Sequence, residues 1–293
     1  MERTKRKPTK RADLIITSDF HLRESPPICR TDDFFAAQTR KLVALSKLQK
    51  EHNCPVIHGG DLWDHWKPSP YLITYAIMHL PKEFWTIFGN HDLPSHSLDL
   101  VDKCGINTLE KVGRIKILSG THWNQIPQEA SFLIEDRKVL VWHVMTYQGK
   151  KPWPGCTDPE SLRLLKKYSE YDIIITGHNH KPFIEEYENR ILVNPGSLMR
   201  QSADQADFRP RVYLYYAQTN TIEPVYLPIT PDVVSREHIE RDAERSDRIS
   251  AFIEKLDGEW QAGLSFEANL EEFFKHNRVR KQTKEIIYKA VES

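Results

Sequence analysis

The stretch that decides the fold is Phe84-Trp85-Thr86-Ile87-Phe88-Gly89-Asn90-His91-Asp92, an apolar run that ends in a glycine and three polar residues. Two earlier stretches, residues 14–19 and 55–61, follow the same plan, because each passes from a β-branched run to an aspartate. Apolar residues at helical spacing predict helices between these strands, over residues 34–50 and 71–80. Strands that alternate with helices in this way predict an α/β fold whose sheet is parallel at least in part.

The second half of the main domain is richer in predicted strands. Further short apolar runs occupy residues 132–134, 139–142, 172–176, 183–187, 191–193, 212–216 and 222–226. The first two flank a polar turn, which is typical of an antiparallel hairpin. We therefore expect antiparallel pairing in this half, and an architecture of two packed sheets with helices outside.

The pattern along the chain predicts three segments: a basic flexible arm (residues 1–11), a main domain (residues 12–230) and a helical C-terminal extension (residues 231–293). The arm holds six basic residues and one acidic residue. In the extension the strand pattern stops and the charge density rises. The clearest helical stripe there consists of Phe266, Leu270, Phe273 and Phe274.

The bulk composition excludes several classes of protein. The 293 residues carry 41 basic and 41 acidic side chains, so a protein coated uniformly with basic residues is excluded. No apolar run approaches the roughly 20 residues of a membrane-spanning helix, and no secretory leader is recognisable, so we expect a cytoplasmic protein without membrane contact. The four cysteines are far apart, which predicts reduced, mostly buried thiols and no thiolate zinc site.

Five polar blocks follow predicted strands, and their residue types indicate metal binding. In an open α/β sheet, the loops that leave the carboxyl ends of the strands converge on one crevice. The donor atoms there would be oxygen and nitrogen, from Asp19, His21, Asp61, Asn90, His143, His178 and His180. Seven donors are too many for one tetrahedral ion, and they suit two divalent ions that share one carboxylate.

The charges of such a site predict its ligand. Two divalent ions carry more positive charge than Asp19 and Asp61 neutralise, so the site would attract a phosphate and lower the pKa of a bridging water. These are the requirements for in-line hydrolysis of a phosphate ester. Each block alone is ordinary, since a lone histidine such as His143 is more often a core residue. The combination of all five blocks at strand ends is what indicates the site.

In this series of motifs the chain resembles the calcineurin-like metallophosphoesterase superfamily, whose motifs are D-x-H, GD, GNH[DE], H and GHxH. The chain provides Asp19-x-His21, Gly60-Asp61, Gly89-Asn90-His91-Asp92, His143 and Gly177-His178-x-His180, over residues 13 to about 226. The resemblance implies a β-sandwich flanked by helices, with a catalytic domain over residues 12–230. It also implies a metal-dependent phosphoesterase activity at a two-metal site.

The resemblance further implies a role for each residue. The first ion would be held by Asp19, His21 and His180. The second would be held by Asn90, His143 and His178, and Asp61 would bridge the two. His91 would protonate the leaving oxygen or stabilise the transition state with help from Asp92, and a hydroxide between the ions would be the nucleophile. The expected ions are Mn²⁺, with Fe²⁺, Zn²⁺ or Mg²⁺ as alternatives.

Within the superfamily, residues 60–64 and 89–92 look most like SbcD-type DNA-repair nucleases. We therefore expect a DNA exonuclease or endonuclease of DNA repair or recombination, with DNA as its substrate. The basic arm agrees with this, as do four basic residues of the last predicted helix: Arg278, Arg280, Lys281 and Lys284. The alternative is a phosphodiesterase or phosphatase that acts on small nucleotides, including cyclic ones. A scaffold without activity is disfavoured because all seven donors are present.

Other contacts are less specified by the sequence. Trp63 and Trp66 follow Asp61 closely and would either stack on bases or pack a loop. Asp64 lies in the same motif and is a further candidate for substrate binding. Arg200 would contact a phosphate or form a surface salt bridge. Residues 231–293 resemble nothing recognisable and would form a homodimer, bind a partner ATPase or cover an apolar face.

Overall fold

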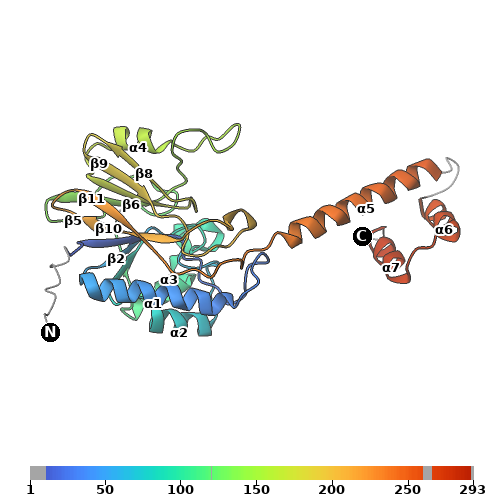
Figure 1. Cartoon of the computed structure of the whole chain (residues 1–293), viewed down its shortest axis with the longest axis horizontal. Helices are drawn as coiled ribbons and strands as arrows, with labels where there is room; N and C mark the ends of the chain where they lie inside the picture. Colours follow the sequence, from blue (N-terminus) through green and yellow to red (C-terminus); the bar gives the residue numbers. More distant parts are fainter. Residues whose placement is uncertain (1–10, 120, 260–265, 292–293) are drawn as a thin grey trace, which may run out of the picture. The chain divides into compact units, whose positions relative to one another are not determined.

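The structure is a computed structural model that describes residues 11–119, 121–259 and 266–291. The chain divides between Ser235 and Arg236 into two compact units (Figure 1). The predicted basic arm lies outside the described residues except for Arg11.

The division between the units lies five residues beyond the boundary that the sequence pattern suggests. The backbone N–H of Thr31 donates to the carbonyl of Val233, and the N–H of Ser235 donates to the carbonyl of Cys29. Residues 231–235 are therefore held by the first unit, as a short antiparallel pairing that is too brief to appear as a strand pattern.

The first sheet of the first unit contains six strands in the order β11-β10-β1-β2-β3-β4. Strands β1 to β4 run parallel, whereas β10 is antiparallel to both β1 and β11. The strands are β1 Leu14–Thr17, β2 Val56–His58, β3 Phe84–Thr86, β4 Lys116–Ile117, β10 Arg211–Tyr216 and β11 Thr221–Tyr226. The connections contain helices α1 (Phe34–His52), α2 (Pro70–His79) and α3 (Gly105–Lys111). The predicted alternation of parallel strands and helices is confirmed.

The second sheet contains five strands in the order β5-β6-β7-β9-β8. They are β5 Phe132–Ile134, β6 Arg137–His143, β7 Ile173–Gly177, β8 Phe183–Tyr187 and β9 Arg190–Asn194. The expected antiparallel pairing is correct for β5 with β6 and for β8 with β9. It is wrong in the centre, where β6, β7 and β9 run parallel. The crossover from β6 to β7 contains a short helix, α4 (Ser161–Lys167), which packs on β8 and β9.

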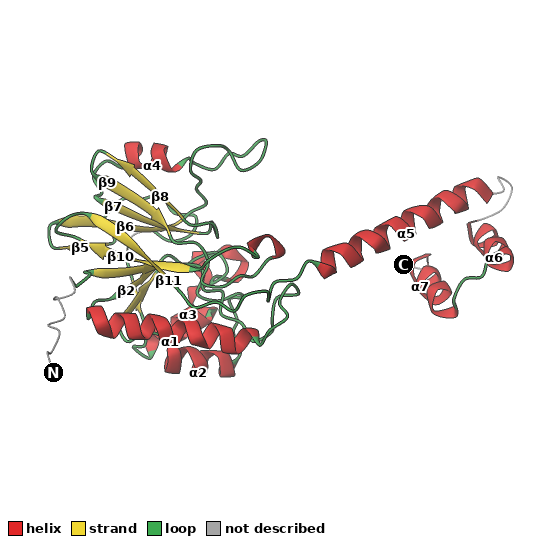
Figure 2. Ribbon diagram, viewed as in Figure 1, coloured by secondary structure: helices red, strands yellow, loops and turns green. Residues whose placement is uncertain are grey.

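The residues of β1 show how the layers pack. Leu14 and Ile16 lie in the core between the two sheets, together with Val141 and Ile173. Ile15 points to the opposite face, into the core beneath the helices. Because both faces are covered, the strand is apolar throughout, and each fully buried aliphatic side chain contributes about 1.5–3 kcal/mol. The layers are helices, sheet, sheet and helix (Figure 2), which confirms the expected sandwich.

Helices α1 and α2 begin where the sequence supplies a cap. The side chain of Asp33 accepts a hydrogen bond from the N–H of Ala36, and that of Ser69 accepts one from the N–H of Leu72. Helix α1 ends at Asn53, which adopts a left-handed conformation with φ 53°. These caps fix the lengths of the crossovers and therefore the points at which β2 and β3 begin.

The carboxyl ends of five parallel strands meet at one edge of the sandwich. In the first sheet, Thr17, His58 and Thr86 lie side by side at the ends of β1, β2 and β3. In the second sheet, His143 at the end of β6 is paired with Gly177 at the end of β7. His143 is itself one of the polar blocks identified in the sequence, and the other four blocks lie at the ends of the other strands and in the loops that follow them.

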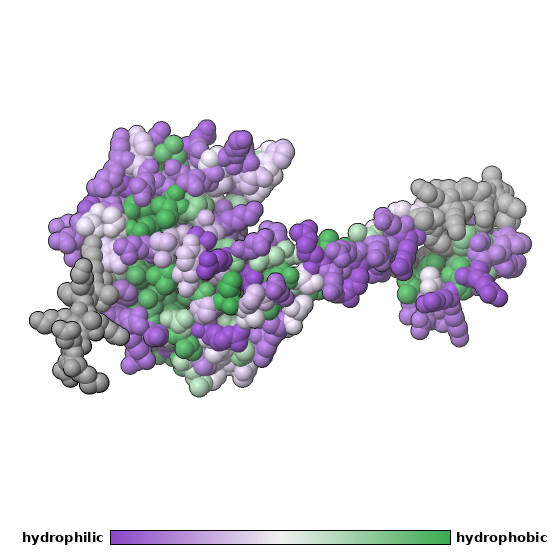
Figure 3. Space-filling model, viewed as in Figure 1, coloured by the Kyte–Doolittle hydropathy of each residue, from purple (hydrophilic) through white to green (hydrophobic). Residues whose placement is uncertain are grey.

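The second unit is helical, as expected for the extension. It contains α5 (Glu237–Glu259), α6 (Phe266–His276) and α7 (Lys281–Val291). Leu270, Phe273 and Phe274 form its buried cluster, whereas Phe266 at the start of the stripe is exposed. In Figure 3 the visible face of α5 is predominantly hydrophilic.

Two further expectations concern the chain as a whole. The four cysteines are buried and free, as expected. Within the described ranges, none of the helices combines the length and the apolar character that crossing a membrane requires.

Candidate metal centre

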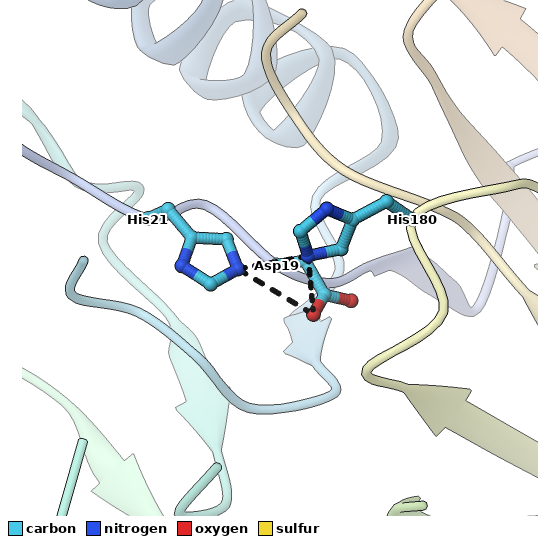
Figure 4. A group of neighbouring side chains, drawn as sticks. All are labelled: Asp19, His21 and His180. Carbon is cyan, nitrogen blue, oxygen red and sulfur yellow. Dashed lines mark hydrogen bonds and ion pairs between the residues drawn. The ribbon is translucent and has the colours of Figure 1, made fainter. Parts of the chain in front are cut away.

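The first donor cluster consists of Asp19, His21 and His180 (Figure 4). The Nε2 atoms of the two imidazoles lie 3.0 Å apart. Oδ1 of Asp19 lies 3.8 Å from Nε2 of His21 and 3.7 Å from Nε2 of His180. Asp19 and His21 are buried, whereas the side chain of His180 is 39% exposed. The three donor atoms therefore converge on a point that solvent reaches on the His180 side.

The second donor cluster consists of Asp61, His143 and His178, with Asn90 beside them. Oδ1 of Asn90 lies 2.9 Å from Nδ1 of His178 and 3.1 Å from Nε2 of His143. Nδ1 of His143 lies 2.7 Å from the carbonyl oxygen of Gly59. Because a carbonyl oxygen only accepts, this Nδ1 carries a proton, and Nε2 is the ring atom that faces the cluster.

Asp61 connects the two clusters. Its Oδ2 atom lies 3.3 Å from Nε2 of His143 and 3.7 Å from Nε2 of His21. Its Oδ1 atom accepts a hydrogen bond from the backbone N–H of His91 at 2.8 Å. The structure thus brings all seven predicted donors together in two adjoining clusters, with Asp61 between them. Their role as metal ligands is a prediction that this geometry fits.

The backbone is strained at four of the seven donors. Asp19, His21, Asp61 and His178 have φ angles of 50°, 43°, 58° and 80°, in the left-handed region that side chains other than glycine rarely adopt. Each such residue costs on the order of 1–3 kcal/mol, and such strain gathers at functional sites. The turns aim four donor side chains inward directly after the strands end.

Two glycines permit the close approach of these loops. A Cβ atom on Gly89 would overlap Oδ1 of Asp61, and one on Gly60 would lie 2.6 Å from Nδ1 of His143. Gly60 also has a φ of 95°. Side chains at these two positions would occupy the space of the donor groups themselves.

The electrostatics of the site favour a bound cation. Burial would lower the pKa of His143, but the Asp61 carboxylate outweighs burial and raises that pKa to about 9. Burial would raise the pKa of Asp61, yet the charge and hydrogen bond of His143 hold it below its ordinary value. The site therefore stabilises positive charge at the point where Asp61 and His143 meet.

The imidazoles of His178 and His21 are in the form that binds metals. Burial lowers the pKa of His178 to about 4 and that of His21 well below its ordinary value. Both rings are therefore neutral at pH 7, with a lone pair available for coordination. Neutral imidazoles, carboxylates and one amide oxygen form a donor set that suits divalent transition metals, and these residues fit two such ions.

His91 lies beside the first cluster, but Asp92 does not assist it. The ring of His91 is 4.7 Å from that of His21, centroid to centroid, and its Nδ1 lies 2.8 Å from the carbonyl oxygen of Asp64. The Asp92 carboxylate is fully buried. It accepts backbone hydrogen bonds from Asp61, Leu62, Trp63 and Gly89. The expected catalytic help from Asp92 is therefore corrected: its carboxylate fastens the loop after β2 to the loop after β3.

Two of the three substrate-binding candidates are wrong. Trp63 is fully buried, so its indole packs the loop and is not available to stack on a base. Arg200 is 4% exposed and donates to the carbonyls of Ala206 and Thr230, so it contacts neither a phosphate nor a surface carboxylate. Asp64 is partly exposed and pairs with Arg23 at 3.1 Å, and its carbonyl contacts the ring of His91. Substrate binding by Asp64 remains a prediction.

Arg200 belongs to a second buried charged group, which we call the arginine cluster: Arg30, Asp32, Lys41 and Arg200. Arg30 donates to both carboxylate oxygens of Asp32, at 2.8 and 2.7 Å, and to the carbonyl of Arg200 at 2.9 Å. Lys41 is 3% exposed. Burial, followed by the charges of Arg30 and Arg200, lowers the pKa of Lys41 to about 7.

Two contributors to the site are missed by the sequence reasoning. Nδ2 of Asn194 donates to the carbonyls of Asn179 at 2.5 Å and Lys181 at 2.8 Å, and so holds the loop that carries two donor histidines. The ring of Trp123 stacks on that of His178, with centroids 4.9 Å apart. Asn194 directly follows a predicted strand (residues 191–193), which is a usable signal, but Trp123 lies in a loop without any motif.

Comparison with known proteins identifies the main part of the chain. The family model described as the calcineurin-like phosphoesterase superfamily domain matches residues 13–215. A protein of Methanocaldococcus jannaschii named probable metallophosphoesterase is 34% identical over 119 residues, which are 40% of this chain and 59% of the relative. A protein of Methanothermobacter thermautotrophicus with the same name is 30% identical over 122 residues, 40% of this chain and 67% of the relative. The chain thus spans about three fifths of the length of the first relative.

The solved structures are more distant. A structure described as a novel archaeal phosphodiesterase is 18% identical, with a TM-score of 0.42, and the match covers 73% of this chain and 99% of that one. A protein of Thermus thermophilus is 11% identical, with a TM-score of 0.45, covering 75% of this chain and 100% of that one. Likeness at this level says nothing about activity.

Proposed function

Because the chain belongs to the calcineurin-like phosphoesterase superfamily, we propose that it is a metal-dependent phosphoesterase and that it hydrolyses phosphodiester bonds in DNA. The observation that carries this proposal is the pair of donor clusters that share Asp61. Two divalent ions held there would neutralise a phosphodiester and activate a water for in-line attack.

The accessibility of the site supports a polymeric substrate. His91 is exposed and the side chain of His180 is 39% exposed, so the first cluster opens to solvent. Two cations lie close to it in the sequence, since Arg23 follows His21 by two residues and the exposed Lys181 follows His180. An open centre with cations beside it suits a charged strand that continues past the reacting phosphate.

The structure of His91 suits it to protonating the leaving oxygen. Because the carbonyl oxygen of Asp64 only accepts, Nδ1 of His91 carries a proton, and Nε2 is left for the substrate. A proton on Nε2 would then be delivered to the departing oxygen. Asp92 contributes indirectly, because it holds the two loops in which Asp61 and His91 lie.

We propose Mn²⁺ as the working ion. The donor set contains four imidazole nitrogens and three oxygen donors, namely two carboxylates and one amide. The oxygen donors suit Mn²⁺, whereas the four imidazoles disfavour Mg²⁺, which prefers an all-oxygen shell. The choice is tested by removing metal from the protein, restoring each ion in turn and measuring hydrolysis of bis(4-nitrophenyl) phosphate.

The role in DNA repair or recombination and the partners of the second unit are also proposals. Residues 231–275 hold six basic and twelve acidic side chains, so this stretch suits a protein partner, such as a second copy or an ATPase, better than DNA. Of the basic residues in or before α7, Arg278, Arg280 and Lys281 are exposed and available for DNA.

One experiment tests the DNA proposal. The full chain with Mn²⁺ is incubated with linear, circular and single-stranded DNA, and with bis(4-nitrophenyl) phosphate. Cleavage of circular DNA indicates an endonuclease, and cleavage of linear DNA alone indicates an exonuclease. His91→Ala is expected to lower the rate about 10²–10⁴-fold. The control His276→Ala, which changes an exposed histidine of α6, should keep the wild-type rate.

A specific outcome contradicts the DNA proposal. If the protein hydrolyses bis(4-nitrophenyl) phosphate but cleaves no DNA with any of the four ions, the alternative of small nucleotides applies. A cavity of about 610 Å³ beside the second cluster favours that alternative, because it has room for one nucleoside. Hydrolysis of 3′,5′-cyclic AMP would then be measured.

A further inference from the structure

The cavity beside the second donor cluster contains residues for which the hydrolytic chemistry has no use. Its volume is about 610 Å³, and His143 and His178 form one of its sides. Further lining side chains are Trp123, Ile126, Trp142, Met145, Trp153 and Asp158. Three of the seven tryptophans of the chain thus face one cavity next to the metal centre.

Two of these tryptophans are held in place. The N–H of Trp123 donates to the carbonyl of Phe88 at 3.0 Å, and its ring stacks on His178 at an interplanar angle of 29°. Trp142 lies on β6, is 7% exposed and packs edge-on against Tyr168. These two walls are therefore part of the folded body and do not depend on a ligand.

The third tryptophan lies in the long loop between β6 and α4, drawn as loop in Figure 2. The base of this loop is closed by hydrogen bonds from Thr146 Oγ1 to the carbonyl of Pro159 and from the N–H of Ser161 to the carbonyl of Tyr147, both at 2.8 Å. Trp153 is nevertheless 47% exposed. A large indole kept half in water beside a metal centre gains burial when a flat apolar group covers it.

The charges around the cavity indicate what that group is. Among the described residues that line it, none is lysine or arginine, and Asp158 is acidic. A phosphate would therefore find no lysine or arginine to pair with on these walls, whereas a neutral aromatic ring with N–H groups would be accepted. On the outer loop, the Nζ atom of Lys151 is held by the carbonyl of Cys156 at 2.8 Å, near Trp153 in the sequence. This cation suits a backbone phosphate next to the bound ring.

We propose that this cavity binds one unpaired nucleobase of the substrate, stacked on Trp153 and Trp123, while the adjoining phosphodiester lies at the donor clusters. The proposal rests on the phosphodiester hydrolysis proposed above and names its substrate class as nucleotides with an accessible base. A base inside a duplex must leave its stack to enter, so single-stranded DNA is cleaved faster than duplex DNA.

The test compares two substrates of equal backbone charge: a single-stranded thymidine oligonucleotide and an oligonucleotide of the same length in which every residue is abasic. For the wild-type protein with Mn²⁺, kcat/KM is expected to be about 5- to 100-fold higher for the oligonucleotide with bases, the range that stacking of one base supplies. Trp153→Ala should reduce this ratio to near one. The control Tyr71→Ala, an exposed aromatic residue of α2, should keep the wild-type ratio.

A second readout does not depend on hydrolysis. In EDTA, quenching of tryptophan fluorescence by each oligonucleotide is measured for the wild-type protein and for Trp153→Ala. Quenching that requires bases and is lost in Trp153→Ala supports the cavity as the base site, even if no DNA is cleaved and the DNA proposal fails. Equal cleavage and equal quenching by both oligonucleotides, or an unchanged ratio in Trp153→Ala, overturns the base site and leaves DNA hydrolysis intact.

Discussion

The first unit contains two buried groups of charged side chains, and they differ in how their polar atoms are satisfied. In the arginine cluster, the guanidinium groups of Arg30 and Arg200 donate to Asp32 and to backbone carbonyls. In the metal centre, donor atoms of His21, His180 and Asp61 face one another across 3.0–3.7 Å.

The backbone differs as well. Four donors of the metal centre have positive φ, whereas no residue of the arginine cluster does among the described part of the chain. Charged side chains that are paired by hydrogen bonds, on a backbone of ordinary conformation, stabilise the fold. Polar side chains that lie close together on a strained backbone form a site that a ligand would complete. Hydrogen-bond pairing and backbone conformation therefore distinguish the structural arginine cluster from the functional metal centre, although both consist of charged and polar residues.

The largest effect is expected from exchanging the shared carboxylate. Asp61→Asn removes the charge that both clusters use, and kcat/KM for bis(4-nitrophenyl) phosphate should fall by about 10³-fold or more. The melting temperature of the metal-free protein should also fall, because His143, 3.3 Å away, loses the buried carboxylate with which it pairs.

The matched change in the arginine cluster should lower stability without lowering activity. Asp32→Asn leaves Arg30 with a weakened partner, so the free energy of unfolding should fall by about 1–3 kcal/mol. The value of kcat/KM should remain within about twofold of wild type. If Asp32→Asn abolishes activity in a folded protein, the two clusters do not differ as described.

The second effect concerns the space between the donors. In Gly89→Ala the new Cβ meets Oδ1 of Asp61 and displaces it, and a shift of this kind costs about 10²-fold in rate. Gly113→Ala is the control, because nothing lies within 4 Å of the added Cβ, even though the φ of Gly113 is positive, at 69°. Equal losses of rate in the two variants would show that displacement of Asp61 is not the cause.

The third effect is the response to metal. Ions that bind only the folded protein should raise its free energy of unfolding, by about 2.7 kcal/mol at a concentration of one hundred times Kd. Thermal unfolding in Mn²⁺ and in EDTA measures the difference. The stabilisation should disappear in Asp61→Asn and persist in Asp32→Asn. Stabilisation of Asp61→Asn by Mn²⁺ to the wild-type extent would place the ions elsewhere.

A further effect is the pH dependence of stability that Lys41 causes. Its pKa of about 7 in the folded protein lies below the ordinary value of 10.5, so the charged form is destabilised by folding. Below pH 7 the penalty is fully present, because the side chain is charged in both states. Between pH 7 and about 10.5 the unfolded chain holds a proton that the folded chain lacks, and the penalty fades by at most about 1.4 kcal/mol per pH unit.

Urea unfolding at pH 6, 8 and 9.5 tests this sign. The free energy of unfolding should be higher for Lys41→Met than for the wild-type protein. This difference should be largest at pH 6 and should shrink as the pH rises. Lys47→Met, an exposed change on the same helix, should follow the wild-type pH dependence. A difference for Lys41→Met that stays constant from pH 6 to 9.5 would show that Lys41 keeps its ordinary pKa.

The sequence predicted the outline of the site because its donors occupy positions fixed by strand ends. Asp19, Asp61 and Asn90 each follow a parallel strand of the first sheet, so their convergence follows from topology alone. The direction of β7 was not predictable in this way, since Ile173–Gly177 is buried on both faces and reads the same in either orientation. The short α4 gave no periodic signal to reveal the crossover.

The partners of individual side chains could not be predicted. Asp92 stands next to His91 in the sequence, yet its carboxylate binds four amides of two loops, a set that only the folded backbone defines. Trp63 likewise reads as an exposed aromatic of a polar loop and is fully buried. Trp123 and Trp153 come from separate loops, and no spacing relates them before the sheets pack.

The left-handed backbone at Asp19, His21, Asp61 and His178 also restricts how this protein can change over time. Only glycine, asparagine, aspartate and, less readily, histidine adopt this conformation at modest cost. A descendant that stops binding metal can therefore exchange these donors for asparagine or glycine and keep the shape of its loops. Valine or isoleucine at the same positions would strain the backbone of the turn itself. Loss of metal binding and loss of the loop conformation thus require different substitutions. The residue type at these four positions shows which of the two has occurred in a related protein.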